Sequence, residues 1–356
     1  MRIFAVRLDS DGDVLLTGPA IRALAAGGHE VIAVVGPRGR QAAALLPGVA
    51  RVVVWHCGWV DGDAPPVTAE TVGATVAELA ALAADEAVVF TSFHQSPLPT
   101  ALVLRLAGVR RTAGASVDFP GGLLDVRARP GDPAQDPTVD LPDDLPEPER
   151  ALAIAARAGH QPGPDDDGCL RVTTPPGSAD TARELLAAHG VSDGQRYVVL
   201  HPGASVPARA WPPWRCAAGV AALRATGQRV IVTGAPGETG LTAAVAGEDG
   251  IDLGGATSFA VLAEVLRGAD AVVVGNTGPA HLAAAVGTPV VSLFAPVVPP
   301  VRWAPYGVPH VLLGDQQAAC RGTRARECPV PGHPCLAGVP PEAVVEAVAR
   351  LTDHGE

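Results

Sequence analysis

The sequence contains no lysine, so all 26 of its basic residues are arginine. Acidic residues number 37, and the formal net charge at pH 7 is −11. Nucleic-acid binding depends on a surplus of positive charge against the phosphates. The charge balance therefore argues against a nucleic acid as the main partner, and any phosphate-binding site must be local.

Long apolar runs are also absent, although hydrophobic residues make up 47% of the chain. No run reaches the roughly 18 residues needed to cross a bilayer. Residues 1–13 lack the apolar stretch and small-residue cleavage site of a secretory signal. We therefore expect a cytoplasmic protein without a membrane span, and a peripheral membrane contact stays open.

Three common catalytic signatures are missing. The G-x-x-x-x-G-K-[ST] phosphate loop, the G-x-G-x-x-G dinucleotide fingerprint and the G-x-S-x-G nucleophile elbow do not occur. Ordinary nucleotide triphosphate hydrolysis, dinucleotide binding of that type and serine hydrolase chemistry are therefore unsupported.

Three of the six cysteines fall in one late stretch, Cys320, Cys328 and Cys335, with His333 nearby. Their spacings are looser than the C-x-x-C pairs of zinc ribbons. A structural metal and an ordered loop both stay open, while scattered reduced thiols fit a cytoplasmic protein better.

The first half of the chain follows an alternating pattern of strands and helices. An apolar strand, a glycine-containing turn, a helix and a second strand form a βαβ unit, which predicts a parallel sheet covered by helices. The expected strands are residues 3–8, 29–36, 49–55 and 86–92, and the expected helices are residues 14–26 and 69–84.

The composition changes to Pro, Asp and Gly between residues 127 and 167, apart from a short helical stretch at 150–159. This composition predicts a connection between two domains, of which a part could pack over a cleft. We expect the boundary near residues 165–180.

The second half repeats the same pattern, with near-continuous Val and Ile runs typical of buried parallel strands. The expected strands are residues 197–203, 229–237, 271–279 and 289–296, and the expected helices are residues 214–226, 258–269, 280–287 and 340–353. We predict one α/β domain at 1–170, a second at 171–340, and a C-terminal helix at 341–356 that is long enough to cross back to the first domain. Such sheets bind ligands outside the carboxyl ends of their strands.

The loop from Asp9 to Asp13 follows the first strand and precedes the first helix. Its carboxylates Asp9, Asp11 and Asp13 repel one another, and one of them could act as a general base. Alternatively, Asp9 or Ser10 caps the helix and the other carboxylates are solvated.

Two loops of the second half could bind phosphate. The turn His201–Ser205 has small residues that allow close backbone approach, and Arg209 follows it. In Gly275–His281 an apolar strand runs directly into a helix start, where backbone N–H groups, Thr277 and His281 could hold a diphosphate. Glu238, which follows Gly234, could accept hydrogen bonds from ribose hydroxyls. Each loop could also be a plain turn or helix cap.

Taken together, these loops resemble glycosyltransferase family 9, the bacterial ADP-heptose heptosyltransferases of lipopolysaccharide assembly. The matching stretches, in family order, are RLDSDGDVLLTGPAIRAL, HPGASVPARAWPPWR, VVVGNTGPAHLAAAVGTPVVSLFAP and RWAPYGVPHVLL with the Cys-rich tail. The resemblance implies the GT-B architecture, in which two Rossmann-like α/β domains face each other across a central cleft. It also implies that the C-terminal domain holds the nucleotide sugar.

The resemblance implies roles for individual residues. Asp13 becomes the base that deprotonates the acceptor hydroxyl, with Ser10, Asp11 and Gly12 on the acceptor side. Inverting transfer follows, with no cofactor and no metal, because no Asp-x-Asp motif lies at a nucleotide site. The donor-binding residues become Ser205, Arg209, Gly234, Glu238, Asn276, Thr277, Gly278, Pro279 and His281.

Two positions depart from the family pattern. Arg209 replaces a common Lys, which keeps the charge but changes its shape. Asn276 replaces a common Asp, so the side chain near the donor is an uncharged amide. The expected substrates are an ADP-sugar donor, best a heptose, and a glycan or small natural-product acceptor. Two alternatives stay open: the same fold could use another nucleotide-activated sugar as its donor, or the protein could bind a nucleotide sugar without catalysis.

Overall fold

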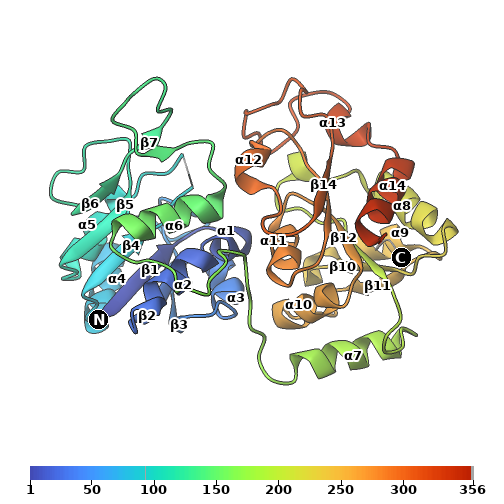
Figure 1. Ribbon diagram of the computed structural model, residues 1–356, viewed down its shortest axis with the longest axis horizontal. Helices are drawn as coiled ribbons and strands as arrows, with labels where there is room; N and C mark the ends of the chain where they lie inside the picture. The colour runs from blue at the N-terminus through green and yellow to red at the C-terminus, as the bar shows by residue number, and fades with distance from the viewer. Residues whose placement is uncertain (93, 354–356) are drawn as a thin grey trace. The chain divides into compact units, whose positions relative to one another are not determined.

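The computed structural model describes residues 1–92 and 94–353. The chain divides into two compact units, Met1–Thr173 and Thr174–Glu356 (Figure 1). The division lies within the predicted range of residues 165–180. Each unit contains its own parallel sheet and is described separately below.

The first unit is built on a six-stranded sheet with the strand order β3-β2-β1-β4-β5-β6. Every neighbouring pair in it is parallel. Its strands are β1 (Arg2–Arg7), β2 (Glu30–Val35), β3 (Val49–Val54), β4 (Glu86–Val89), β5 (Arg111–Ala115) and β6 (Val126–Ala128). Its helices are α1 (Asp11–Leu16), α2 (Gly18–Ala26), α3 (Arg40–Ala43), α4 (Ala69–Ala81), α5 (Leu98–Leu106) and α6 (Glu147–Arg157), with a 3-10 turn η1 (Pro37–Gly39).

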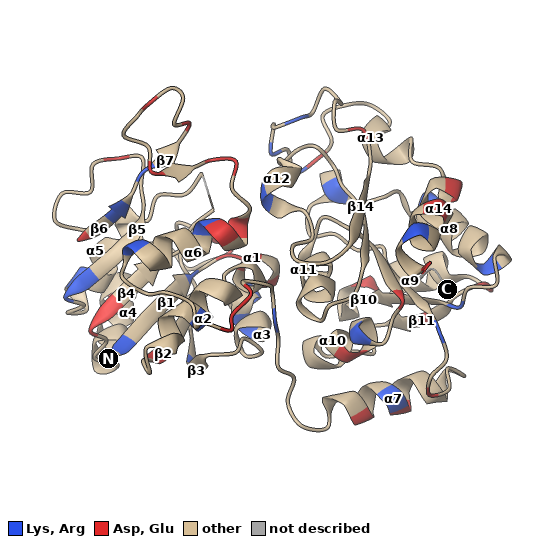
Figure 2. Ribbon diagram, viewed as in Figure 1, with Lys and Arg blue, Asp and Glu red and all other residues tan. Residues whose placement is uncertain are grey.

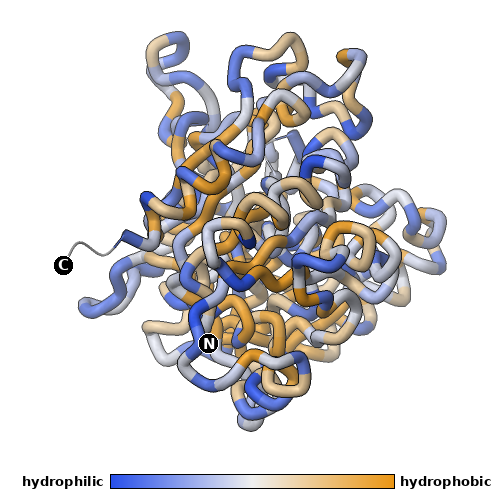
Figure 3. Tube along the Cα trace, turned by 90° about the vertical axis from the view of Figure 1, so that its right-hand side faces the viewer, coloured by the Kyte–Doolittle hydropathy of each residue, from blue (hydrophilic) through white to orange (hydrophobic). Residues whose placement is uncertain are grey.

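Alternating residues of β1 supply the two faces of this sheet. Phe4 and Val6 are fully buried and share a core cluster with Leu79 of α4 and Leu104 of α5. The hydropathy trace in Figure 3 alternates between hydrophobic and hydrophilic segments, and most residues of the valine-rich strands are buried, as expected for strands covered on both faces. Helix α6 packs on α2.

The segment 127–167 belongs to the first domain, so the prediction of an interdomain connection there was wrong. It contains part of β6, a two-stranded sheet of β7 (Pro130–Gly131) and β8 (Leu141–Pro142), and helix α6. Its far end is tied down by a bidentate pair between Arg22 on α2 and Asp166, at 2.7 Å for each N–O contact. Proline and aspartate fix this loop through turns and ion pairs, which composition alone does not distinguish from a flexible linker.

The second unit repeats the arrangement with the order β11-β10-β9-β12-β13-β14, again parallel throughout. Its strands are β9 (Val198–His201), β10 (Val230–Gly234), β11 (Ile251–Gly254), β12 (Ala271–Gly275), β13 (Val290–Leu293) and β14 (His310–Leu313). Its helices are α7 (Ser178–Ala188), α8 (Pro213–Ala225), α9 (Thr239–Ala246), α10 (Phe259–Arg267), α11 (Gly278–Ala285), α12 (Pro300–Trp303), α13 (Pro334–Ala337) and α14 (Pro341–Thr352), with 3-10 turns η2 (Pro207–Arg209) and η3 (Pro236–Glu238).

The last helix, α14, packs one face against the core of the second unit. Val344, Ala347 and Val348 belong to the same cluster as the strands β9, β10, β12 and β13. The sequence left room for this helix to return to the first domain, but its apolar face is covered by α8 and the second sheet. Residues 354–356 of the predicted C-terminal segment lie outside the described residues.

Both sheets reverse their strand order at one place, between β1 and β4 in the first unit and between β9 and β12 in the second. Ligands of open parallel sheets bind outside the carboxyl strand ends at such a switch point. Acidic and basic residues are interspersed over both units (Figure 2). Among the described residues, every helix is too short or too polar to cross a bilayer.

Candidate functional site

Asp13 lies at the switch point of the first sheet, within the first turn of α1. The helix expected from Val14 begins at Asp11 and breaks at Thr17, before the Gly18–Pro19 start of α2. Proline at the start of α2 removes a backbone donor, which explains the break. Asp11 and Asp13 are therefore helical residues rather than loop residues.

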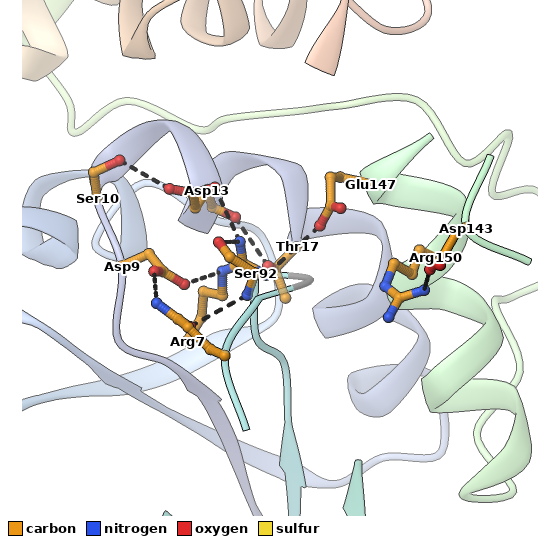
Figure 4. A network of polar contacts seen from close by, with 10 residues as sticks. Arg7, Asp9, Ser10, Asp13, Thr17, Ser92, Asp143, Glu147 and Arg150 are labelled. Atoms are coloured by element: carbon orange, nitrogen blue, oxygen red, sulfur yellow. Dashed lines mark hydrogen bonds and ion pairs between the residues drawn. The ribbon is translucent and has the colours of Figure 1, made fainter. Parts of the chain in front are cut away.

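One buried guanidinium organises the carboxylates around Asp13. Arg7, only 4% exposed, ends β1. Its Nη2 lies 2.9 Å from Asp13 Oδ1, its Nε 2.9 Å from Asp9 Oδ2, and its Nη1 3.8 Å from Glu147 Oε2 of α6. Nη2 also donates to Ser92 Oγ at 3.2 Å. Figure 4 shows these side chains grouped around Arg7.

The Asp13 carboxylate is held at both oxygens yet remains accessible. Ser10 Oγ donates to Asp13 Oδ2 at 3.0 Å, while Arg7 holds Oδ1. Ser10 occupies the N-cap position but makes no capping hydrogen bond, and the alternative in which Asp9 or Ser10 caps this helix is not found. Because 22% of the Asp13 side chain stays exposed, a hydroxyl group can approach it.

The charges in this cluster are unequal, with three carboxylates against one guanidinium. Burial alone would lower the pKa of Arg7, but Asp9, Asp13 and Glu147 outweigh it and raise the pKa. Burial raises the pKa of Asp9, and the neighbouring Asp13 and Glu147 add to that rise against the opposing effect of Arg7. An excess of negative charge around a fixed carboxylate favours proton uptake.

Asp11 and Gly12, predicted on the acceptor side with Ser10, are placed differently from Asp13. Asp11 Oδ1 accepts the backbone N–H of Ala42 at 2.8 Å, so the side chain is turned to α3. Burial raises its pKa to about 6, although the Ala42 hydrogen bond acts in the opposite direction. Gly12 is buried inside the helix.

In the second unit, the loops after β9 and β10 meet. His201 Nδ1 lies 3.0 Å from Thr233 Oγ1, and burial lowers the pKa of His201 to about 4, with Glu238 opposing the shift. The imidazole is therefore neutral at pH 7. At this pH His201 therefore offers a hydrogen bond rather than a positive charge.

The Glu238 carboxylate rests on the turn that follows β9. Its Oε2 accepts the N–H of Ala235 at 2.8 Å. A Cβ at Gly203 would lie 2.2 Å from Glu238 Oε1, so a side chain at this position would have to displace the carboxylate. At Gly234 an added Cβ would meet Thr242 Cγ2 at 2.5 Å. The structure thus brings Glu238 together with the turn predicted to bind phosphate.

The loop from Gly275 to His281 joins β12 to α11 at the second switch point. Asn276 is 3% exposed, and neither its Oδ1 nor its Nδ2 has a hydrogen-bond partner. The adjacent Thr277 Oγ1 is likewise buried without a partner, and it makes no capping bond at the N-terminus of α11. A Cβ at Gly275 would lie 2.8 Å from the carbonyl oxygen of Arg209, so glycine permits close contact between the two loops.

The remaining predicted donor residues flank this loop. Gly278 and Pro279 form the first turn of α11, and His281 in the same helix is buried at 5% exposure. Arg209 ends the short turn η2, partly buried, whereas Ser205 is exposed. The loops after β9, β10 and β12 therefore converge on one edge of the second sheet.

The late cysteine stretch is ordered, and all six cysteines are free. Cys320 and Cys335 are buried, and burial together with the neighbouring Cys320 raises the pKa of Cys335 to about 12. His333 Nε2 lies 3.1 Å from the carbonyl oxygen of Ala208. Over residues 1–92 and 94–353, no three His, Cys, Asp or Glu side chains are grouped so that they could hold a metal ion.

Sequence reasoning missed several residues of both sites. An Arg directly after an apolar run is a signal that could have identified Arg7, since an unpaired buried charge is costly. Glu147 carried no such signal in its Pro-rich surroundings. Ser92, Gln95 and Thr233 can be assigned to the sites only when the strand order is known, because that order brings distant segments of the chain together.

Two Rossmann-like α/β domains, each with a polar site at its switch point, define the GT-B class of fold, as the resemblance implied. Residues 144–333 match glycosyltransferase family 9 (heptosyltransferase), and the chain belongs to this family of enzymes. The prediction of both family and fold class is confirmed.

Individual relatives agree with this assignment. The chain is 32% identical over 149 residues to lipopolysaccharide heptosyltransferase 3 of Escherichia coli, a match that spans 39% of this chain and 43% of that protein. The fold matches a family 9 glycosyltransferase of Veillonella parvula DSM 2008 with a TM-score of 0.80 at 18% identity, over 99% of this chain and 98% of that chain. E. coli ADP-heptose LPS heptosyltransferase II matches with a TM-score of 0.72 at 18% identity, again over 99% and 98%.

Proposed function

We propose that this protein is a cytoplasmic, inverting glycosyltransferase that transfers a heptose from ADP-heptose to a hydroxyl of a glycan or natural-product acceptor. The observation that carries the proposal is the buried, unpartnered side chain of Asn276, next to Thr277, at the switch point of the second sheet. The protein's membership of family 9 supplies the reaction class.

The unpartnered atoms favour a bound polar ligand. A buried amide or hydroxyl without a hydrogen bond costs about 1–3 kcal/mol, so a ligand that satisfies it gains affinity. A nucleoside diphosphate sugar offers suitable partners, because its hydroxyls both donate and accept. The E. coli heptosyltransferase WaaC has been solved with ADP and with ADP-2-deoxy-2-fluoro heptose, which supports an ADP-sugar as the donor.

The diphosphate can be stabilised by the protein without a metal. The N-terminus of α11 carries a partial positive charge, and Thr277 adds a hydroxyl donor. Arg209, predicted to neutralise phosphate, belongs to the loop that packs against Gly275. We expect ADP release to continue in EDTA. Loss of activity in EDTA, with recovery on adding Mg²⁺, would contradict this part of the proposal.

Asp13 is the proposed base. It removes the proton of the acceptor hydroxyl, the acceptor oxygen attacks the anomeric carbon from the face opposite the diphosphate, and the bond to the diphosphate oxygen breaks. ADP leaves with that electron pair, the configuration inverts, and the proton stays on Asp13 Oδ1 or Oδ2. Ser10 and Arg7 position the carboxylate, and the other carboxylates keep its surroundings negative.

A cytoplasmic location is supported by the thiols. All six cysteines are free, as expected in a reducing compartment. Recovery of the native protein in the periplasmic fraction of the source cells would contradict this location.

Calorimetric titration of the purified protein with ADP, UDP, GDP and ADP-heptose tests the donor. We expect selective binding of ADP and ADP-heptose. Preference for another nucleotide would keep the fold class but reject the heptose donor. Binding of ADP-heptose with no ADP release for any acceptor hydroxyl would support the catalytically silent alternative.

The Asp13→Asn variant tests the base. We expect ADP release from ADP-heptose to fall by at least about 100-fold, while ADP affinity stays nearly unchanged. The matched control is Asp85→Asn, since Asp85 accepts a hydrogen bond from Arg2 N at the opposite end of the same sheet. Equal rates for Asp13→Asn and the control would remove Asp13 from the mechanism.

A further inference from the structure

The loop after β4 contacts the network of Arg7 at two points. Ser92 Oγ accepts a hydrogen bond from Arg7 Nη2 at 3.2 Å. Gln95 Nε2 donates to Asp9 Oδ1 at 2.7 Å. The two loop residues are also joined to each other, because Gln95 N donates to Ser92 O at 2.9 Å. The proposed transfer assigns no role to Gln95.

The side chain of Gln95 is held in one orientation. Its Oε1 accepts the backbone N–H of Ser92 at 3.3 Å, which only the oxygen end of a carboxamide can do. The Nε2 end therefore faces Asp9, and only 11% of the Asp9 side chain is exposed. A hydrogen bond of 2.7 Å to a carboxylate is of the strong, charge-assisted kind, and water has little access to replace it.

Asp9 connects this contact to Arg7. While Asp9 Oδ1 binds Gln95, its Oδ2 lies 2.9 Å from Arg7 Nε. Because the guanidinium is planar, holding Nε also fixes the direction of Nη2, which lies 2.9 Å from Asp13 Oδ1. A continuous chain of contacts therefore runs from Gln95 through Asp9 and Arg7 to Asp13.

The charge of Asp9 influences how well Asp13 binds a proton. If Asp9 takes up a proton, it no longer repels the Asp13 carboxylate, and the charge of Arg7 acts more strongly on Asp13. Both effects make Asp13 a weaker base. Burial raises the pKa of Asp9, and Arg7 opposes this rise. The nearby carboxylates of Asp13 and Glu147 add to the rise, whereas the hydrogen bond from Gln95 opposes it.

The titratable groups around Asp9 come from four segments. They are Arg7 of β1, Asp13 of α1, Glu147 of α6 and Cys57 after β3. Burial raises the pKa of Cys57 to about 11, with Asp9 adding to the rise, so this thiol stays neutral where a carboxyl group titrates. Gln95 is uncharged, so its effect on Asp9 can be removed without changing the net charge of the cluster.

We propose that Gln95 is a positioning residue for the transfer, which keeps Asp9 as a carboxylate and thereby lets Arg7 hold Asp13 as a base. The inference rests on the proposed function, because Gln95 affects the reaction only through Asp13. Loss of the Gln95 hydrogen bond should weaken the base in acid rather than remove it.

Gln95→Met tests the chain of contacts, because it removes the hydrogen bond but keeps the length and charge of the side chain. The full chain is labelled with carbon-13 at its aspartate carboxyl groups, and Asp9→Asn and Asp13→Asn assign the two signals. In Gln95→Met, we expect Asp9 to take up its proton about one pH unit higher, and the Asp13 signal to shift at that same pH. An unchanged titration of Asp9, or an Asp13 signal that does not respond to it, would overturn the inference.

The pH dependence of ADP release from ADP-heptose, with water as the acceptor, tests the effect on the reaction. In Gln95→Met the acid limb of kcat should move up by the same pH interval, while the plateau stays within about threefold and KM stays unchanged. A loss that is equal at every pH would indicate a merely structural role and overturn the inference. The matched control is Gln135→Met, since Gln135 Nε2 also donates to an aspartate, Asp132 Oδ2, at 2.7 Å, but on an exposed loop. Its acid limb should not move, and a shift equal to that of Gln95→Met would count against the proposal.

Two further comparisons separate this inference from the proposed function. In an Asp9→Asn background, Gln95→Met should cause no further change, and an added loss would exclude the route through Asp9. A slow Asp13→Asn variant, combined with an Asp13 signal that ignores Gln95→Met, would overturn the inference and leave the proposed base standing. Wild-type turnover in Asp13→Asn would instead reject the base, while the contact chain seen by NMR would stand.

Discussion

The two sheets have equivalent strand orders, but the polar side chains at their switch points are paired differently. In the first domain, the buried Arg7 meets Asp9, Asp13 and Glu147, and each carboxylate lies within 3.8 Å of its guanidinium. In the second domain, the buried Asn276 has no hydrogen-bond partner at either side-chain atom. In the first site the charged side chains pair with one another, whereas in the second site polar atoms are left without a partner and could bind a ligand.

Under the proposed function, this difference separates a positioned base from a binding surface. A base works best when its carboxylate is fixed before the substrate arrives, and Arg7 and Ser10 fix Asp13. A binding loop gains affinity when its polar atoms find their partners only in the ligand. We therefore expect substitutions in the first site to reduce stability and substitutions in the second to reduce affinity.

The largest expected effect is on the stability of the first domain. Arg7→Met leaves three carboxylates without their cation and should lower the free energy of unfolding by about 3–5 kcal/mol. Hydrogen exchange of the β1 peptide in urea measures this. Arg171→Met, which breaks the exposed pair with Asp167, is the control and should change stability by no more than about 0.5 kcal/mol. Similar losses in both variants would mean that Arg7 is not the organising charge.

In the second domain, His201 should make the stability sensitive to acid. The pKa of His201 falls from its ordinary 6.5 to about 4 on folding, so the unfolded chain takes up the proton first. Its contribution to stability is present above pH 6.5 and is lost as the pH falls toward 4, by about 2 kcal/mol between pH 7 and 5. Urea unfolding of wild type and His201→Asn at both pH values measures this. A pH dependence that is equal in the two proteins would refute it.

Asn276→Ala should separate affinity from stability in the second site. It removes atoms that make no hydrogen bond in the free protein, so ADP-heptose affinity should fall about tenfold while the free energy of unfolding does not decrease. Thr288→Val is the opposite control. Thr288 is equally buried but donates to the Leu266 carbonyl at 2.8 Å, so this change should cost about 1 kcal/mol of stability and leave the affinity intact. Equal changes of affinity and of stability in the two variants would refute the proposed difference between the sites.

The smallest expected effect comes from Asp11. Its pKa rises from 3.8 to about 6 on folding, so the unfolded chain loses its proton first as the pH rises. Asp11 therefore stabilises the fold fully below pH 3.8, and this contribution is lost as the pH rises through 6. The free energy of unfolding should fall by about 1 kcal/mol between pH 5 and 7. Asp11→Asn should remove this slope in the β1 to α3 region, as followed by hydrogen exchange. A variant that keeps the slope would show that another group titrates there.

The sequence predicted what depends on local pattern. Valine and isoleucine runs identify strands buried on both faces, and Ser258 starts α10 as expected, with its hydroxyl accepting from Val261 N at 3.2 Å. The α5 and β5 elements were missed, since RTAGA lacks an apolar run and α5 begins with Leu-Pro. The segment 127–167 was misread for a similar reason, because ion pairs such as Arg22–Asp166 join residues far apart in the chain.

The candidate sites follow the same division. Asp13 lies in the first turn of α1, and Asn276 and Thr277 lie between β12 and α11. Parallel sheets place functional groups at such positions, and the sequence predicted these three residues as candidates. Their surroundings depend on contacts across the fold. Arg7 and Ser10, which hold Asp13, lie in the same short stretch of sequence, but Glu147 of α6 and Ser92 after β4 reach Arg7 only through the fold.

The contact between Arg7 and Glu147 also has a consequence for synthesis on the ribosome. The first strand emerges early, but the carboxylate from α6 follows about 140 residues later, roughly ten seconds at ordinary rates of translation. Until then Arg7 has only two of its three carboxylate neighbours, Asp9 and Asp13. The charge cluster at the first switch point is thus complete only after α6 has been synthesised, and a chain that stops short of α6 lacks its third carboxylate.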